Sequence, residues 1–173
     1  MVIPREELKI KNNMLKVKSK DIDISNLCYI AGFLEGSPSG CILSQIVRRK
    51  DYKLGFELRL SISFYQKVNR YWFILKLSKY LKSLGIKSNS GKKSDGMSYL
   101  TITGDNQVKK LLEMIYPYLL LKKRLARLTL DIINLKKTIK KEDDFIEVCK
   151  LIDKTSDYRD SKKRKITTET VED

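Results

Sequence analysis

The sequence predicts an α+β fold in which antiparallel hairpins alternate with helices in the order αββαββα, with further helices behind them. Residues 54–66 alternate between apolar and polar side chains, which is the pattern of a strand with one buried face. Two strand pairs, at 41–66 and 86–104, each contain a short turn and are each preceded by an apolar helical segment. An antiparallel sheet with one polar face packs its helices on the other face.

The first half of the chain contains one helix and one long hairpin. Ser25 is the expected N-cap of a short apolar helix that ends at Gly36, and residues 37–40 form a Ser-Pro-Ser-Gly turn. Residues 41–49 are the first strand and residues 54–66 the second, joined by a Lys-Asp-Tyr-Lys turn.

The second half contains a shorter hairpin, at residues 86–104, among four helices. The residues expected to begin these helices are Asn69, Asp105, Pro117 and either Asp143 or Asp144. The chain therefore divides into an N-terminal arm (residues 1–24), one domain (25–156) and a basic, irregular C-terminal tail (157–173).

Composition limits the classes of function. The chain carries 36 Lys+Arg against 21 Asp+Glu, a net charge of +15, and 13 basic residues against two acids lie between Ile46 and Lys93. Such a block indicates a polyanionic partner, chiefly nucleic acid, and a solvated lysine surface is the alternative. The chain has no histidine, which excludes Ser-His-Asp hydrolases, Cys-His proteases and histidine zinc sites. Three cysteines in apolar surroundings are expected to be buried thiols in a reducing compartment.

No segment predicts contact with a membrane or export. The apolar runs are far shorter than the roughly 20 residues that span a bilayer. The N-terminus alternates lysine with single apolar residues and has no signal-peptide pattern, so the protein is expected not to be secreted.

The segment Ile30–Pro38, IAGFLEGSP, is the most distinctive in the sequence. Small residues at Ala31 and Gly32 let a second backbone approach an apolar helix closely, and an ordinary buried helix is the alternative. This segment and the order of elements around it resemble the LAGLIDADG homing endonucleases, in particular single-motif, homodimeric members from green-algal chloroplast rRNA introns. The resemblance covers about residues 25 to 171, and its other segments are FYQKVNRYWF (64–73), PYLLLKKRLARL (117–128) and residues 143–171.

The resemblance implies a homodimer and a DNA-binding saddle. Two motif helices would pack at a two-fold axis through Tyr29, Ala31 and Gly32, and the strands would lie in the major groove of a pseudo-palindromic duplex. The candidate groove-facing residues on the first hairpin are Gln45, Arg49, Glu57, Arg59, Ser61 and Ser63. In the second hairpin the alternation leaves the polar face undecided, and the weaker candidates are Ser88, Ser90 and Lys92. For all of these residues, contact with water alone is the alternative.

The resemblance also assigns groups around the scissile phosphate. Gln66, Arg70 and Lys122 match the family's catalytic Gln, Arg and Lys, although each could be an ordinary surface residue. A cationic pair can stabilise charge that develops on a phosphate. The family's C-terminal loop, which contacts the DNA backbone, matches Ser161, Lys162, Lys163, Arg164 and Lys165.

The sequence departs from the family at its metal-binding acid. The position that normally holds Asp is Ser37, or Ser39 if the turn is aligned from its C-terminal side. A serine hydroxyl holds Mg²⁺ poorly, and two-metal hydrolysis depends on the bound ions. Glu35 is the one acid in the motif and the one candidate to substitute.

The expected function is therefore a homodimeric protein that binds double-stranded DNA, with cleavage lost or impaired and no required cofactor. One alternative is an active, Mg²⁺-dependent homing endonuclease that uses Glu35. Another is an RNA-binding splicing helper or rRNA-associated protein, although A-form major grooves are too deep and narrow for a β ribbon. The resemblance implies an organelle, chloroplast or mitochondrion, as the setting.

Overall fold

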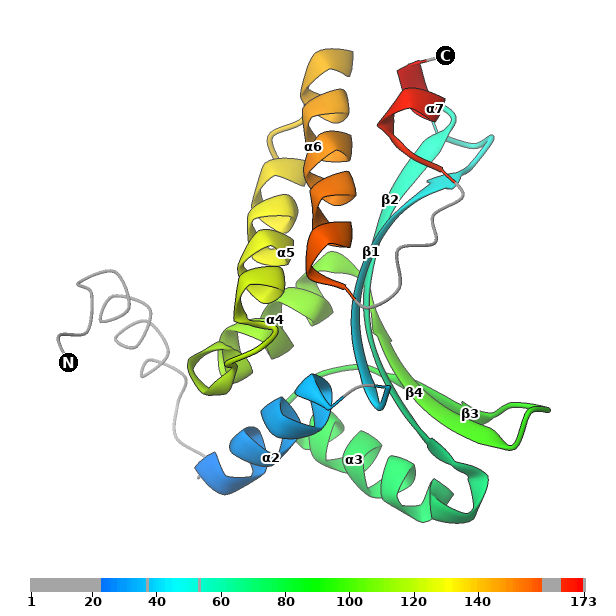
Figure 1. Cartoon of the computed structure of the whole chain (residues 1–173), viewed down its shortest axis with the longest axis vertical. Coiled ribbons are helices and arrows are strands. Elements are labelled where there is room, and N and C mark those ends of the chain that lie inside the picture. Colours follow the sequence, from blue (N-terminus) through cyan, green and yellow to red (C-terminus); the bar gives the residue numbers. More distant parts are fainter. Residues whose placement is uncertain (1–22, 37, 53, 160–165, 173) are drawn as a thin grey trace, which may run out of the picture.

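A computed structural model describes residues 23–36, 38–52, 54–159 and 166–172. Its centre is a four-stranded antiparallel sheet of β1 (Gly40–Arg48), β2 (Phe56–Lys67), β3 (Asn89–Lys92) and β4 (Met97–Thr103). The strands lie in the order β1-β2-β4-β3, so the two hairpins meet along β2 and β4. The curved sheet has α4, α5 and α6 beside its β1–β2 part and α2 and α3 near its other end (Figure 1). The predicted α+β fold is confirmed.

The two faces of the sheet differ as the alternation predicts. On β2, Leu58, Leu60, Ile62 and Phe64 are buried against the helices. Residues between them point to the opposite face, which the described helices leave open. Cross-strand partners share a face, so Gln45 on β1 lies beside Arg59, and the whole polar row of the first hairpin is placed on the open face.

Five helices of 11 to 14 residues with apolar faces surround the core, and one short helix of five residues follows at the C-terminal end. The helices are α2 (Ile24–Glu35), α3 (Tyr71–Ser83), α4 (Asp105–Ile115), α5 (Lys123–Lys136), α6 (Glu142–Lys154) and α7 (Thr168–Glu172). No helix among the described residues is long and apolar enough to cross a membrane.

The predicted helix starts need correction at several places. Asp23, not Ser25, caps α2, because the Asp23 carboxylate accepts the Ser25 amide. Asn69 lies in a 3-10 turn (Val68–Arg70) that precedes α3. The cap of α4 is Gly104, whose φ of 88° favours glycine, and Asp105 is the first helical residue. At α6 the prediction of Asp144 is close, since its carboxylate accepts the amides of Lys140 and Lys141 and thereby lowers its pKa.

The largest difference concerns the helix expected from Pro117. A 3-10 turn occupies Tyr116–Tyr118, Leu119 is extended, and α5 begins only at Lys123. The intervening residues cross the end of α2, where the Glu35 carboxylate accepts backbone hydrogen bonds from them. These tertiary bonds hold the segment out of the helix that its sequence favours.

The second hairpin presents a different face from the one considered in the sequence. Asn89 pairs with Thr101 and Gly91 with Tyr99, which places these odd-numbered residues on the open face. The weaker candidates Ser88, Ser90 and Lys92 therefore lie on the helix side, so those assignments are wrong. Ser88 hydrogen-bonds to Ser78 of α3, and the Lys92 ammonium lies 5.0 Å from the ring centre of Tyr71.

The C-terminal tail is more regular than expected where it is described. A 3-10 turn (Thr155–Tyr158) follows α6, and α7 packs against α6. The Asp153 carboxylate accepts both the amide and the hydroxyl of Thr168 at 2.8 and 2.5 Å, which anchors the start of α7. Residues 1–22 of the proposed arm and residues 160–165 lie outside the described part.

The cysteine prediction holds for one of three thiols. Cys149 is buried, and burial raises its pKa to about 12. Cys41 is half-buried, whereas Cys28 is exposed on α2 because it faces away from the core of the chain.

Candidate nucleic-acid interface

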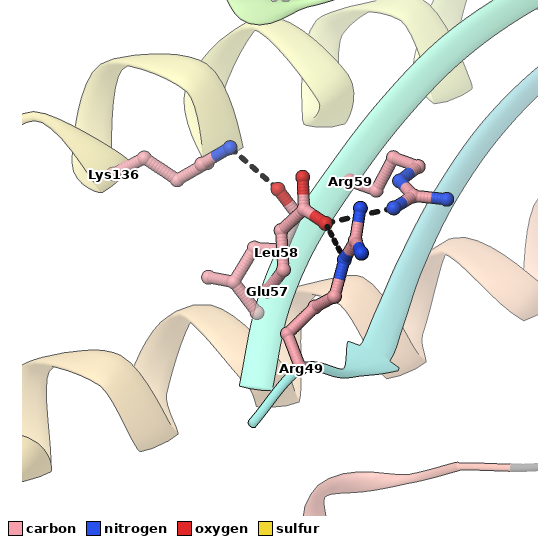
Figure 2. Close-up of polar contacts among 5 residues, drawn as sticks. All are labelled: Arg49, Glu57, Leu58, Arg59 and Lys136. Atoms are coloured by element: carbon pink, nitrogen blue, oxygen red, sulfur yellow. Dashed lines mark hydrogen bonds and ion pairs between the residues drawn. The ribbon is translucent and has the colours of Figure 1, made fainter. Parts of the chain in front are cut away.

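The outer end of the open face carries a charged network on β1 and β2. The Glu57 carboxylate accepts hydrogen bonds from Arg59 Nη2 at 2.8 Å and Arg49 Nε at 3.2 Å (Figure 2). The bond from Arg59 is the largest cause that holds the pKa of Glu57 below its ordinary value. Two guanidinium groups share one carboxylate, so this end of the sheet presents a net positive charge in a fixed arrangement.

A lysine on a neighbouring helix braces this network from the helix side. Lys136 of α5 donates from Nζ to the Leu58 carbonyl at 2.6 Å and pairs with the Asp105 carboxylate at 2.8 Å. Figure 2 shows Lys136 reaching Leu58 from the neighbouring helix. The bond fixes the strand that displays Glu57 and Arg59.

The remaining predicted groove residues differ in accessibility. Gln45 is exposed and Ser61 is half-buried. Ser63 is only 8 % exposed, and its hydroxyl lies 3.0 Å from that of Thr101. Ser63 is on the predicted face, but its hydroxyl links β2 to β4.

The inner end of β2 lies beside the end of the motif helix. The Tyr65 amide donates to the Ser39 carbonyl at 2.8 Å, which joins the two segments. Arg70 Nη1 donates to Gln66 Oε1 at 3.4 Å, so two of the predicted phosphate-pocket residues touch. Both side chains lie at the surface, where a nucleic-acid strand could reach them.

Glu35 and Lys122 form a reciprocal clamp between α2 and the segment before α5. Glu35 Oε1 accepts the amides of Leu120 and Lys122 at 2.5 and 3.1 Å. Lys122 Nζ donates to the carbonyls of Leu34 and Gly40, both at 2.7 Å. The two charged groups expected to serve chemistry are thus bonded to the backbone.

Gly40 makes the clamp geometrically possible. A Cβ on Gly40 would lie 2.2 Å from the Leu34 carbonyl oxygen, so a larger residue would separate α2 from β1. Because the Leu34 and Gly40 carbonyls come together here, one ammonium group can bridge both.

The described donors do not fit a Mg²⁺ site held by carboxylates. Hard divalent cations take carboxylate and carbonyl oxygens, and Mg²⁺ usually needs one or two carboxylates. Glu35 is the one acid between residues 30 and 40, and its Oε1 already accepts two amides. No group of three or more His, Cys, Asp or Glu that could hold a metal occurs within the part of the chain that the structure covers.

The predicted dimer surface on α2 is partly available. Tyr29 is 58 % exposed, and Gly32 is exposed with open space beside its Cα. Ala31 is fully buried inside the chain, so its side chain is not offered to a partner. The Tyr29 ring contacts Phe73, and Phe73 in turn contacts the exposed Trp72, which extends the apolar surface onto α3.

Several functional candidates were missed in the sequence. Leu120 and Leu121 are each 82 % exposed, and the Leu120 amide is bonded to Glu35; the sequence predicted a helix over this segment and so did not indicate this exposure. Lys93, Tyr65 and Tyr99 gather on the open face, and the register of the second hairpin was the missing signal. The loop residues Ser161, Lys162, Lys163, Arg164 and Lys165, like Ser37, lie outside the described residues.

Known proteins are similar to this chain both in sequence and in fold. Residues 30–139 match the family model "LAGLIDADG endonuclease". The chain is 34% identical to DNA endonuclease I-CvuI of Chlorella vulgaris, over 86% of this chain and 89% of the relative. It is 36% identical to DNA endonuclease I-CreI of Chlamydomonas reinhardtii, over 84% and 85% respectively.

The solved structures agree with these sequence relatives. I-CvuI on the I-CreI target, in 2 mM Mg with the DNA not cleaved, superposes with a TM-score of 0.79 at 33% identity, covering 87% of this chain and 92% of that one. The archaeal endonuclease I-Vdi141I, complexed with DNA, has the same fold with a TM-score of 0.72 at 20% identity, over 86% and 92%.

Proposed function

The chain belongs to the LAGLIDADG endonuclease family, and from this premise we propose that it is a homodimeric protein that binds double-stranded DNA but cleaves it poorly or not at all. The observation that carries the proposal is the clamp at the end of the motif. Glu35 and Lys122 are bonded to the backbone there, and the family's metal-binding acid is replaced by Ser37 or Ser39.

Binding is supported by the open face of the sheet. It carries Gln45, Arg49 and Arg59 in a row that no described helix covers, within a chain of net charge +15. A β ribbon fits the major groove, where the base edges carry a distinct pattern of donors and acceptors. The loop of Lys162, Lys163, Arg164 and Lys165 would add contacts to phosphates, which position the protein on the duplex.

Loss of cleavage follows from what the inner-end residues can do. Gln66 and Arg70 can hold a phosphate at the surface, and Arg70 can neutralise its charge. Hydrolysis in this family uses divalent metals, which activate water when bound. The described donors do not fit such a site, so this chain's residues can bind and orient the phosphate without a means to activate water.

A homodimer is supported by the exposed surface of α2 and its neighbours. Tyr29 and Gly32 on α2, and Leu120 and Leu121 in the segment bonded to Glu35, are exposed, and a second copy would bury them across a two-fold axis. Two identical sheets would then read a pseudo-palindromic target. Replacing Gly32 with Leu should prevent the close helix approach and yield a monomer in sedimentation, whereas a monomeric wild type at micromolar concentration would contradict the dimer.

Two alternative functions are tested by the experiment described below. An active endonuclease would require Glu35 to leave its two amides, and an RNA-binding role would require a surface other than the β ribbon. The organellar setting expected from the resemblance remains part of the proposal.

The direct test uses a library of duplexes and measures binding and strand scission on the same sample in Mg²⁺ and in Mn²⁺. We expect selective retention of one duplex family that stays uncut in both metals. Efficient scission would contradict the loss of cleavage, and retention of RNA in preference to duplex DNA would contradict the proposed ligand.

A further inference from the structure

We propose that Lys93, Tyr65 and Tyr99 form a base-reading cluster at the inner end of the saddle, which selects guanine at one position of each half-site. This inference rests on the proposed binding of duplex DNA by the open face. It adds a specificity site where β2 meets the second hairpin, away from the charged network of Arg49, Glu57 and Arg59.

The three side chains are brought together by strand pairing. Tyr65 on β2 and Tyr99 on β4 are direct cross-strand partners on the open face. The Lys93 ammonium lies 4.7 Å from the ring centre of Tyr65 and 6.0 Å from that of Tyr99. Both distances are within the range in which an aromatic ring attracts a cation, so the two rings hold the ammonium between them.

Gly91 creates the space for Tyr99. It is the cross-strand partner of Tyr99 on β3, and a Cβ on Gly91 would lie 2.9 Å from the Tyr99 hydroxyl and 3.0 Å from two ring carbons. The Tyr99 ring therefore lies across β3 at the one position of that strand with no side chain. Any larger residue at Gly91 would push the ring away from Lys93.

The cluster has the chemistry of a base reader. An ammonium group carries three donors, and aromatic faces do not consume them as a carboxylate would. Guanine presents two acceptors, O6 and N7, in the major groove, and lysine is one of the side chains that pair with them. A lysine already restricted between two rings loses less side-chain entropy when it binds a base.

The position of the cluster predicts where it reads. Tyr65 follows Glu57 by eight residues on the same strand, which corresponds to roughly 26 Å at 3.3 Å per residue. A strand that follows the groove would cover about seven or eight base pairs over that length, at 3.4 Å per base pair. Because Tyr65 is bonded to Ser39 at the motif end, its cluster should read the positions nearer the two-fold axis.

The second hairpin also supplies a matched control. Lys92 is adjacent to Lys93 and likewise lies over a tyrosine, Tyr71, but on the helix side of the sheet. Substitution of either lysine removes one charge and the contact of its ammonium with tyrosine, one ring for Lys92 and two for Lys93. Only Lys93 should affect base preference, because only Lys93 is on the open face.

The experiment selects bound duplexes from a randomised library with the wild type, Lys93→Met, Lys92→Met and Gly91→Ala. We expect the wild type to prefer guanine at one inner position of each half-site. Lys93→Met should reduce that preference on the order of tenfold and leave the outer positions unchanged, and Lys92→Met should leave the profile as it is. Gly91→Ala should weaken the same position although it contacts no base.

The outcomes separate this inference from the proposed function. If Lys93→Met weakened all duplexes equally, Lys93 would be a phosphate contact and the base-reading role would be wrong, with DNA binding intact. An unchanged inner preference in Lys93→Met would likewise overturn the inference alone. A wild type that retained no duplex would overturn both. Thermal melting of each variant checks folding, and Lys93→Met remains decisive if Gly91→Ala fails to fold, because Lys93 is exposed.

Discussion

The two ends of β2 use charged groups in opposite ways. At the outer end, Arg49 and Arg59 bind the carboxylate of Glu57 on the open face. At the inner end, Glu35 and Lys122 bind backbone amides and carbonyls that belong to two different segments. A surface ion pair contributes only about 0–1 kcal/mol, so DNA can replace it at small cost. The Lys122 ammonium cannot leave without depriving the carbonyls of two buried residues, Leu34 and Gly40, of their shared donor.

Under the proposed function, this difference would let the protein bind DNA without cleaving it. The outer network can exchange its partners for bases and phosphates without a change in fold. The inner clamp holds α2, β1 and the start of α5 together, so its residues serve stability first. Experiments that separate stability from DNA binding therefore test the comparison directly.

The largest effect is expected for Lys122→Met. The substitution leaves the Leu34 and Gly40 carbonyls without their shared donor, and two charge-assisted hydrogen bonds are worth about 3 kcal/mol together. Urea unfolding should show this loss, whereas Lys123→Met should change stability far less. Equal stability of Lys122→Met and the wild type would mean that Lys122 does not hold the fold.

The next largest effect is expected from the basic loop. Replacing Lys162, Arg164 and Lys165 together with Ala should weaken binding to every duplex by about 2 kcal/mol and flatten the salt dependence, since phosphate contacts carry no sequence information. Titrations at several salt concentrations measure both quantities. A change in sequence preference with general affinity intact would reverse the roles assigned to loop and sheet.

A smaller and local effect is expected for Arg59→Gln. Loss of this guanidinium should alter preference at one or two outer base pairs by about 1–2 kcal/mol, and Gln45→Ala should affect neighbouring positions because Gln45 pairs with Arg59 across the strands. Competition between single-substituted duplexes provides the measurement. Uniform weakening over all competitors would show that Arg59 binds the backbone instead.

The smallest effect is a pH dependence from Glu57. Its folded-state pKa lies below the ordinary value of 4.5, so its stabilisation is present above that pH and is lost as the pH falls through the folded-state pKa. We expect about 0.5 kcal/mol, because both arginine partners are partly exposed. Between pH 5 and 2, the free energy of unfolding should fall less steeply with decreasing pH in Glu57→Gln than in the wild type. The same pH dependence in both proteins would show that the network has no role in stability.

Features that depend on local sequence pattern could be predicted from the sequence, whereas features that depend on tertiary contacts could not. The alternation from Phe56 to Phe64 places these residues of β2 on their correct faces, because only one register of a period-two pattern buries the apolar side chains. The β3–β4 hairpin is short and rich in Ser and Lys, so its own sequence does not show which face is buried. Only the pairing of β4 with β2 determines which of its residues lie on the open face.

The candidate site shows the same limit. Gln66 near the end of β2 and Arg70 in the 3-10 turn after it are four residues apart, and their contact follows from local geometry. The clamp joins Glu35 to residues 85 and 87 positions later in the chain, so no local pattern could predict it. Its formation also explains why the helix expected from Pro117 begins only at Lys123.

The central claim is that the inner end binds a phosphate but does not support hydrolysis. The most direct measurement is cleavage of a supercoiled plasmid that carries the selected target, in Mg²⁺, by the wild type, Ser37→Asp, Ser39→Asp and Glu35→Gln. The account predicts that the wild type retards the plasmid without cutting it and that an added aspartate at Ser37 or Ser39 restores some scission. A wild type that cuts efficiently, and stops cutting in Glu35→Gln, would contradict it.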